Sequence, residues 1–372
     1  MIFKLLKIYR FILIYGLGRT IYKVLGRMRN TPKILTNSNR HRKHSLNVGF
    51  IGCGQFSFAT ISYFVNNSHQ YHIRAAYDID KDALKSFCHF NNVPIMANSI
   101  EDFFKEKLDF VYIASNHFSH TGYAVKAVEL EIPVHIEKPI CVNWEQYDQL
   151  RKVISQTKTD VFTGYNRPFS PAIIELKQRI SNIKGPFTLN CYVSGHLIES
   201  GHWYREPEEG TRVCGNLGHW IDLAVHILNG ETLPEYINIK LVSSSNDTRD
   251  DNFCVVMTTS NGDLITLILT SRDEPFEGIN ETINFAKGDV LAKIDDFRVA
   301  SYWVGKKVFK RKYFPKDVGH KNAILQHLNK NKYKRDLNEV RLSTALMLEI
   351  KDMVISNKDE FRFYPNNKCY KW

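Results

Sequence analysis

The feature that most constrains the fold is an apolar strand that runs into a glycine turn and then a helix. Residues 46–51 (LNVGFI) have the pattern of a buried strand, and the helix-like stretch FATISYFVNN begins at Phe58. Between them, Gly52 permits a tight turn, and Gly54 lets the backbone approach a pyrophosphate at the helix N-terminus. Ser57 stands where the usual fingerprint has its third glycine. The pattern predicts a dinucleotide-binding turn with the cofactor-binding candidates Gly52, Gly54, Gln55 and Phe56.

A carboxylate stands at the end of the next strand. Residues 71–77 have a strand pattern, and Asp78 follows them, 26 residues after Gly52. A carboxylate at that place suits the adenosine ribose hydroxyls and repels a 2′-phosphate, so NAD is favoured over NADP. Lys81 is the nearby cation that would favour NADP. The alternative role for Asp78 is a turn or helix N-cap carboxylate.

Two more strands, at residues 109–114 and 133–136, are each followed by a helical stretch. Strands that alternate with helices predict a parallel sheet, and ligands bind beyond the carboxyl ends of such strands. The polar residues at these ends are Ser115, Asn116, His117, His120, Glu137 and Lys138. His117 and His120 suit the cofactor side or a helix start. They have no acidic or cysteine partner at metal-ligand spacing, so we expect no metal.

The formal charge of +11 lies in one part of the chain. Residues 1–48 hold eleven basic side chains and no acidic one, which leaves 39 basic and 39 acidic side chains in the rest. A nucleic-acid-binding domain would carry its excess charge on the folded surface, so no nucleic-acid partner is expected. Seven scattered cysteines without a C-x-x-C pair indicate a reducing compartment, and we expect a cytoplasmic protein.

Residues 2–15 predict an amphipathic helix, with Lys4, Lys7 and Arg10 on one stripe and apolar side chains opposite. The longest uncharged run, residues 11–18, is far below the roughly 20 residues that span a bilayer. Three interpretations remain open: residues 1–30 lie on an anionic membrane surface at its cytoplasmic face, they dock on a partner protein, or they are a basic extension without a special role. The polar residues 30–47 read as a linker.

From about Asn47 to the C-terminal helix, the chain resembles the glucose–fructose oxidoreductase / inositol dehydrogenase / MocA (Gfo/Idh/MocA) family. Beyond the glycine turn and Asp78, the resemblance is carried by IASNHFSH (113–120), IEKPI (136–140), TGYNRPFSP (163–171) and GNLGHWID (215–222). HWYREPEEG (202–210) with Arg212, and the Gly-His pair at 319–320, resemble a subgroup associated with bacterial surface-glycan synthesis. The resemblance implies an NAD-dependent dehydrogenase or reductase that acts on a sugar or nucleotide sugar in polysaccharide biosynthesis, and a homo-oligomer.

The resemblance also implies the fold class, which is α/β, with an N-terminal Rossmann dinucleotide-binding domain and a C-terminal α/β domain around an open, mainly antiparallel sheet. The expected boundaries are 1–44 for the basic amphipathic extension and linker, 45–166 for the Rossmann domain and 167–372 for the substrate-binding and oligomerisation domain. Alternating or β-branched runs at 188–195, 237–244, 252–259, 264–271 and 281–285 agree with this. Helical stretches at about 321–329 and 337–355 close the chain.

By the same resemblance, Lys138 polarises the reacting hydroxyl or relays its proton, and His219 accepts the proton. Asp222, three residues further on, orients His219 or binds substrate, with a structural carboxylate as the alternative. The alternative for Arg167 is a salt bridge at the domain interface, and that for Trp203 is core packing. The substrate-binding candidates are Tyr165, Arg167, His202, Trp203, Arg212 and Asn216.

The chain departs from the family next to His219. Many members have an aspartate four residues before the histidine, where this chain has Gly215, and the related subgroup has glutamate at the position of Asn216. Two other functions therefore stay open: an NAD-using epimerase or glycosidase-type enzyme without net redox, and a non-catalytic regulatory or binding protein.

Overall fold

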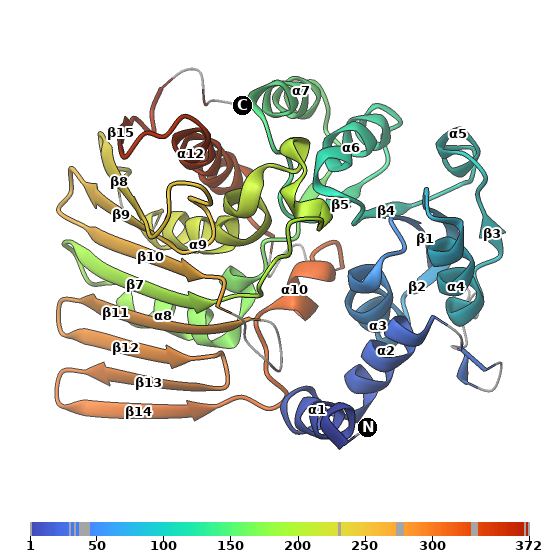
Figure 1. The fold of residues 1–372 in the computed structure, drawn as a ribbon, viewed down its shortest axis with the longest axis horizontal. Coiled ribbons are helices and arrows are strands. Elements are labelled where there is room, and N and C mark those ends of the chain that lie inside the picture. The colour runs from blue at the N-terminus through green and yellow to red at the C-terminus, as the bar shows by residue number, and fades with distance from the viewer. Residues whose placement is uncertain are drawn as a thin grey trace. The chain divides into compact units, whose positions relative to one another are not determined.

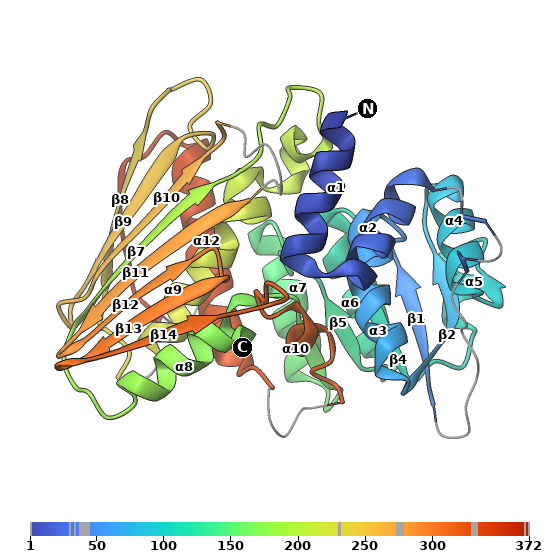
Figure 2. The ribbon, with the colours of Figure 1, turned by 90° about the horizontal axis from the view of Figure 1, so that it is seen from below.

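The computed structural model describes residues 2–29, 31–32, 35–36, 45–229, 232–272, 279–328, 334–367 and 370 (Figures 1 and 2). The chain forms two compact units, Met1–Gly164 with Lys321–Lys334, and Tyr165–His320 with Arg335–Trp372. The first boundary lies two residues from the one expected after residue 166, and the segment 321–334 belongs to the first unit instead of the second. Most of the expected linker, residues 30, 33–34 and 37–44, lies outside the described residues.

The first unit is built on a six-stranded parallel sheet. Its strands are β1 (Leu46–Ile51), β2 (Tyr71–Tyr77), β3 (Ile95–Met96), β4 (Phe110–Ile113), β5 (Val134–Ile136) and β6 (Val161–Thr163). They are ordered β3-β2-β1-β4-β5-β6, which is the order of a Rossmann sheet and confirms that expectation. The carboxyl ends of β1, β2, β4 and β5 therefore share one edge.

Helices alternate with these strands, as parallel connections require. The π-helix η2 (Ser57–Ile61) follows the glycine turn and continues as α3 (Ser62–Ser68). The others are α4 (Lys81–Asn91), α5 (Ile100–Phe104), α6 (His120–Glu129), α7 (Trp144–Ser155) and the short α10 (His320–Ile324) at the unit boundary. Asp80 caps α4 by accepting from the backbone N–H groups of Asp82 and Ala83.

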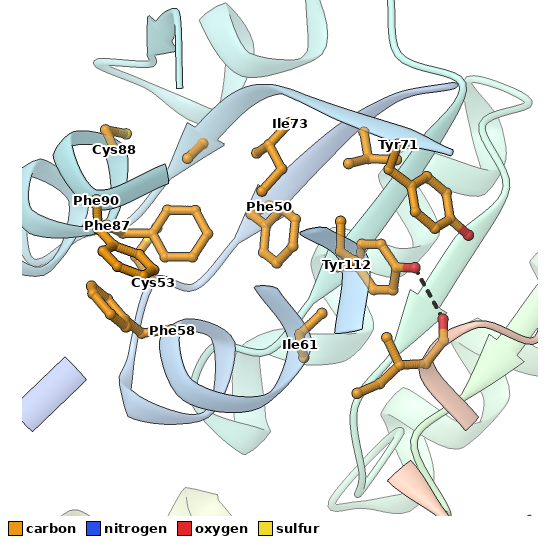
Figure 3. Close-up of a cluster of buried hydrophobic side chains, with 14 of the residues drawn as sticks. Phe50, Cys53, Phe58, Ile61, Tyr71, Ile73, Phe87, Cys88, Phe90 and Tyr112 are labelled. Atoms are coloured by element: carbon orange, nitrogen blue, oxygen red, sulfur yellow. Dashed lines mark hydrogen bonds between the residues drawn. The ribbon is translucent and has the colours of Figure 1, made fainter. Parts of the chain in front are cut away.

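Aromatic side chains fill the core between the sheet and its helices (Figure 3). Phe58 of η2 stacks on Phe90 of α4 at 4.6 Å, and Phe50 of β1 lies 5.2 Å from Tyr112 of β4. The Tyr112 hydroxyl donates to the carbonyl oxygen of Ile324 at 3.0 Å, which ties the returning segment to the sheet (Figure 3).

Two helices precede the sheet: α1 (Ile2–Tyr15) and α2 (Leu17–Met28), separated by Gly16. Leu25 of α2 belongs to the same core cluster, and Tyr22 packs edge-on against Tyr63 and Phe90. The structure thus assigns residues 17–28 to the nucleotide-binding unit. This corrects the expectation of a separate extension over residues 1–44, because one face of α2 is buried on that unit.

The second unit holds a nine-stranded sheet, with the order β14-β13-β12-β11-β7-β10-β9-β8-β15. Its strands are β7 (Phe187–Ser194), β8 (Ile237–Ser243), β9 (Phe253–Thr259), β10 (Leu264–Thr270), β11 (Asn280–Lys287), β12 (Val290–Asp295), β13 (Val299–Val304), β14 (Lys307–Lys312) and β15 (Glu360–Phe363). All neighbours are antiparallel except β7 and β10, so the open, mainly antiparallel sheet is confirmed. α8 (Pro171–Ile180), α9 (Gly218–Leu228) and α12 (Leu337–Ile355) cover one face (Figure 2).

Candidate active site

The glycine turn after β1 has the geometry that a dinucleotide requires. Gly52 has φ +87°, and a Cβ there would lie 2.5 Å from the backbone of Ala114 and Ser115, so only glycine fits. At Gly54, a Cβ would meet nothing within 4 Å, so the backbone is open to an approaching phosphate. Ser57 is buried and donates to the carbonyl oxygen of Gly52 at 2.6 Å, which fixes the helix start against the turn.

Asp78 faces this turn from the end of β2. Its Oδ2 accepts from the backbone N–H of Cys53 at 2.6 Å, and its Oδ1 accepts from the N–H of Asp80 at 2.9 Å. A carboxylate has about four acceptor positions, so Asp78 keeps room for two ribose hydroxyls. The helix N-cap is Asp80, so the N-cap alternative for Asp78 is wrong. The hydrogen bond from the Asp80 N–H agrees with the other alternative, a turn carboxylate.

His120 joins the ends of β4 and β5. Its Nδ1 lies 2.8 Å from the carbonyl oxygen of Pro139, and its Nε2 lies 3.0 Å from that of Ser115. Burial lowers the pKa of His120, although both carbonyls favour the charged form. A neutral imidazole donates from one nitrogen only, so His120 holds the turn instead of contacting a ligand. Next to it, the Ser115 and Ser119 hydroxyls lie 2.6 Å apart, and Asn116 precedes the short helix His117–Ser119.

The Glu137-Lys138-Pro139 turn follows β5, and the Lys138–Pro139 peptide bond is cis. Glu137 is buried, with Oε1 at 3.1 Å from His135 Nε2 and with Oε2 accepting from the backbone N–H of Lys138 at 3.3 Å. Lys138 is partly exposed. The buried carboxylate thus orients the turn, and Lys138 is the less buried of the two charged side chains that follow β5.

Phe56 and Gln55, the two other residues expected to bind the cofactor, differ in their surroundings. Phe56 is 36% exposed beside the turn, where it can meet a ligand. The Gln55 amide nitrogen instead donates to the carbonyl oxygen of Lys23 in α2 at 3.2 Å. Over the part of the chain that the structure describes, no group of three or more His, Cys, Asp or Glu side chains could hold a metal ion.

In the second unit, His219 lies in the first turn of α9 and is partly exposed. Its ring meets the ring of Tyr165 edge-on, with the centroids 6.3 Å apart. Tyr165 is buried, and its hydroxyl lies 3.8 Å from the sulfur of Met347. Of these two candidates, His219 is therefore the one that a substrate can reach.

Asp222 is fully buried, one turn further along α9. Arg335 donates to both of its oxygens, and the Ser343 hydroxyl donates to Oδ1 at 2.9 Å. The carboxylate thus binds Ser343 of α12 and Arg335, which lies two residues before that helix. This favours the structural alternative over the expected catalytic role.

Arg167 is also buried, and both ends of its guanidinium bind Glu281 of β11, from Nε at 2.8 Å and Nη2 at 2.9 Å. Trp220 donates to the same carboxylate at 2.7 Å, and its ring lies 4.1 Å under the guanidinium. The arrangement disfavours a substrate contact. Arg167 and Glu281 both belong to the second unit, so the salt bridge lies within that unit and not at the expected domain interface.

The stretch 202–212 divides into exposed and buried candidates. His202 is exposed and stacks on the partly exposed Trp203 at 5.8 Å, so Trp203 is not a core residue. Arg212 is fully buried and donates to Asp251 at 3.3 Å, and Asn216 is buried in the π-helix Val213–Leu217. A pocket of about 480 Å³ opens beside this stretch, lined among others by Arg205, Thr211 and Asp250.

Sequence reasoning missed one charged residue at the dinucleotide turn. Arg29 Nη1 donates to the carbonyl oxygen of Cys53 at 2.9 Å, and the guanidinium interacts electrostatically with Asp80 and Asp78. Lys81, the cation expected there, instead donates to the carbonyl oxygen of Asn98 at 3.2 Å. The available signal was that Arg29 ends an amphipathic helix whose apolar face needed a partner.

The fold and the turn define a two-unit dinucleotide-binding protein. Residues 46–165 match the family described as "Oxidoreductase family, NAD-binding Rossmann fold" (GFO_IDH_MocA). YceM of Salmonella typhimurium is 26% identical over 37% of this chain and 44% of its own length. Oxidoreductase P35 of Formosa agariphila is 24% identical over 38% of this chain and 44% of its own length. The chain thus spans less than half of the length of these curated relatives.

Solved structures share the fold over most of the chain. A dehydrogenase from Chromobacterium violaceum is 16% identical, with a TM-score of 0.70 over 85% of this chain and 96% of that chain. GenD2 from gentamicin A biosynthesis, in complex with NAD, is 14% identical, with a TM-score of 0.70 over 87% and 98%. An Agrobacterium radiobacter oxidoreductase, in complex with NAD⁺, L-tartaric acid and magnesium, is 15% identical, with a TM-score of 0.70 over 85% and 98%.

Proposed function

We propose that the protein is an NAD-dependent oxidoreductase that moves a hydride to or from a hydroxyl carbon of a sugar or nucleotide sugar, in glycan biosynthesis. The observation that carries the proposal is the carboxyl edge of the Rossmann sheet. There, an open glycine turn follows β1, the Asp78 carboxylate follows β2, and the partly exposed Lys138 follows β5. NAD is favoured over NADP because Asp78 repels a 2′-phosphate.

NAD, when bound, supplies the nicotinamide ring that takes up or releases the hydride. We assign the proton steps to two side chains. The Lys138 ammonium polarises the substrate hydroxyl oxygen, held in place by the Glu137 turn. His219 accepts the hydroxyl proton in the oxidative direction and returns it in the reductive one, because an imidazole changes charge near neutral pH. His202 and Trp203 supply an exposed surface on which a sugar ring can stack.

The test incubates the full-length protein with NAD⁺ and a panel of UDP-sugars and follows NADH by its absorbance. Lys138→Met should lower turnover by at least about 100-fold, as expected for loss of a proton-transfer group. The exposed Lys152 on α7 gives the control Lys152→Met, which should keep full activity. A sugar that changes without net NADH would favour the epimerase-type alternative. Unchanged turnover in Lys138→Met would contradict the assignment of that lysine.

We also propose that α1 and α2 lie on an anionic membrane surface at its cytoplasmic face. Leu5, Tyr9 and Leu13 are spaced by four residues on α1, and they and Leu17 are between 55% and 61% exposed. The same stretch of sequence carries Lys7, Arg10 and Arg19, and no carboxylate precedes Asp78, which suits anionic lipid and disfavours a second copy. Among the described residues, no helix is long and apolar enough to cross a bilayer.

Vesicle sedimentation tests this. The full-length protein should sediment with vesicles that contain phosphatidylserine and stay in solution with phosphatidylcholine alone. Replacing Tyr9 and Leu13 together by glutamate should abolish sedimentation, whereas Leu130→Glu, at a leucine after α6 that is 49% exposed, should not. If the double variant still sediments with the vesicles, α1 and α2 do not form the contact with the membrane.

Finally, we infer that two copies associate through the uncovered face of the nine-stranded sheet. Val242, Tyr192, Leu291, Val299 and Val308 are exposed on that face, from five different strands. The molar mass from light scattering should correspond to a dimer or a larger oligomer. Tyr192→Glu should lower this mass towards that of the monomer. A monomer at all concentrations would contradict the inference.

A further inference from the structure

The last turn of α2 packs directly on the helix that follows the glycine turn. At Gly26, an added Cβ would lie 2.9 Å from the Phe58 ring and 3.1 Å from the Gln55 amide oxygen. Only a residue without a side chain permits this approach. Gln55, the residue after Gly54, donates to the carbonyl oxygen of Lys23 at 3.2 Å. The N-terminal segment and the nucleotide turn are thus one packed structure.

Arg29 extends this contact to the turn itself. It ends α2 in a left-handed conformation (φ 56°), and its backbone N–H donates to the carbonyl oxygen of Leu25. Its guanidinium carbon lies over the Phe58 ring, 5.4 Å from the ring centroid. Nη1 then donates to the carbonyl oxygen of Cys53 at 2.9 Å and to the hydroxyl of Ser86 on α4 at 3.2 Å.

Both polar groups of the Cys53 backbone are therefore held from outside the turn. Asp78 accepts from its N–H at 2.6 Å, and Arg29 donates to its C=O. Hydrogen bonds to a charged group are stronger than those between neutral groups. The guanidinium also lies close enough to Asp80 and Asp78 to offset their negative charge, in a site that must receive a polyanionic cofactor.

We propose that Arg29 is a positioning residue of the dinucleotide site, and that the buried face of α2, with Leu25 and Gly26, holds Arg29 against that site. Arg29 fixes the carbonyl of Cys53 and compensates the carboxylate of Asp78, so the turn is already in its binding conformation before the cofactor arrives. The inference rests on the proposed NAD function. It also predicts that point variants in the full chain are more informative than removal of residues 1–44, because Leu25 and Gly26 are buried.

The test compares NAD⁺ and NADP⁺ affinities by calorimetric titration of full-length variants. Arg29→Met should weaken NAD⁺ binding about tenfold, the effect of losing one charge-assisted hydrogen bond. NADP⁺ binding should weaken at least as much, because its additional phosphate meets less positive charge. Arg29→Lys keeps the charge and should recover part of the loss. Ser86→Ala, which removes the second partner of Arg29 from α4, should weaken NAD⁺ binding to a smaller degree.

Arg27→Met is the matched control, because Arg27 is an exposed cation two residues away on the same helix. It should bind NAD⁺ as the wild type does. The inference is overturned if Arg29→Met and Ser86→Ala bind NAD⁺ with wild-type affinity. It is also overturned if the apoprotein of Arg29→Met melts at a lower temperature than the wild type and Arg29→Lys recovers no NAD⁺ affinity. If the wild type itself binds neither dinucleotide, the proposed function fails first.

Discussion

Arg335 donates two hydrogen bonds to the carboxylate of Asp222, from Nη1 at 2.8 Å and from Nη2 at 3.0 Å. The two residues are 113 positions apart and both are buried. The same guanidinium binds Glu339, which accepts from His226 Nδ1 at 2.8 Å. The group that looked catalytic from its spacing to His219 is therefore the centre of a buried charge network that ties α9 to α12.

Asp222→Asn should accordingly destabilise the fold and spare the chemistry. Removal of the Asp222 charge leaves Glu339 as the remaining carboxylate that offsets the buried charge of Arg335. Breaking a buried ion pair in this way costs about 3–5 kcal/mol. Urea unfolding of the variant should show the loss, whereas Asp247→Asn, at an exposed carboxylate, should unfold like the wild type. NAD⁺ affinity should stay unchanged. A variant that is as stable as the wild type but inactive would restore the catalytic role of Asp222.

Acid should unfold the second unit through Glu339. Burial opposes its charged form, but the hydrogen bond from His226 and the charge of Arg335 together lower its pKa from 4.5 to about 2. Because the folded pKa is the lower one, the stabilisation is complete above the unfolded pKa and is lost as the pH falls towards 2. The shift corresponds to about 3 kcal/mol.

Glu339→Gln should be less stable than the wild type at neutral pH, and this difference should shrink as the pH falls from about 5 to about 2. Chemical unfolding at a series of pH values measures this, with the exposed Glu360→Gln as the control. A difference between Glu339→Gln and the wild type that stays constant over this range would rule out Glu339 as the responsible group.

Gly52→Ala should damage both folding and cofactor binding. The backbone there has φ +87°, and the new methyl group would lie 2.5 Å from main-chain atoms of Ala114, which cannot rotate away. Strain of this kind costs about 2–4 kcal/mol. We expect a lower melting temperature and no measurable NAD⁺ binding. A variant that melts like the wild type would mean that the turn can move relative to β4.

Local patterns were sufficient to predict the Rossmann half, because a parallel strand is a short apolar run and its turn is marked by glycine. The strands 188–195 and 264–271 were predictable for the same reason. The outer strand β14 was not, because four of its six residues are lysine or arginine. The roles of Asp222, Arg167 and Arg29 depend on partners 113, 114 and 24 residues away. Spacing along the chain does not reveal such pairs; only the folded chain brings them together.

A substitution at Gly54 should affect cofactor binding without affecting the stability of the fold. An added Cβ meets nothing within 4 Å, so Gly54→Ala should fold with wild-type stability. The methyl group would occupy the space through which a phosphate approaches the backbone, and NAD⁺ affinity should fall by at least about tenfold. Gly122→Ala is the matched control: its Cβ is equally free, it lies within α6, and it should gain about 0.5–1 kcal/mol without any change in affinity. Equal NAD⁺ affinities for the two variants would place the pyrophosphate away from this turn.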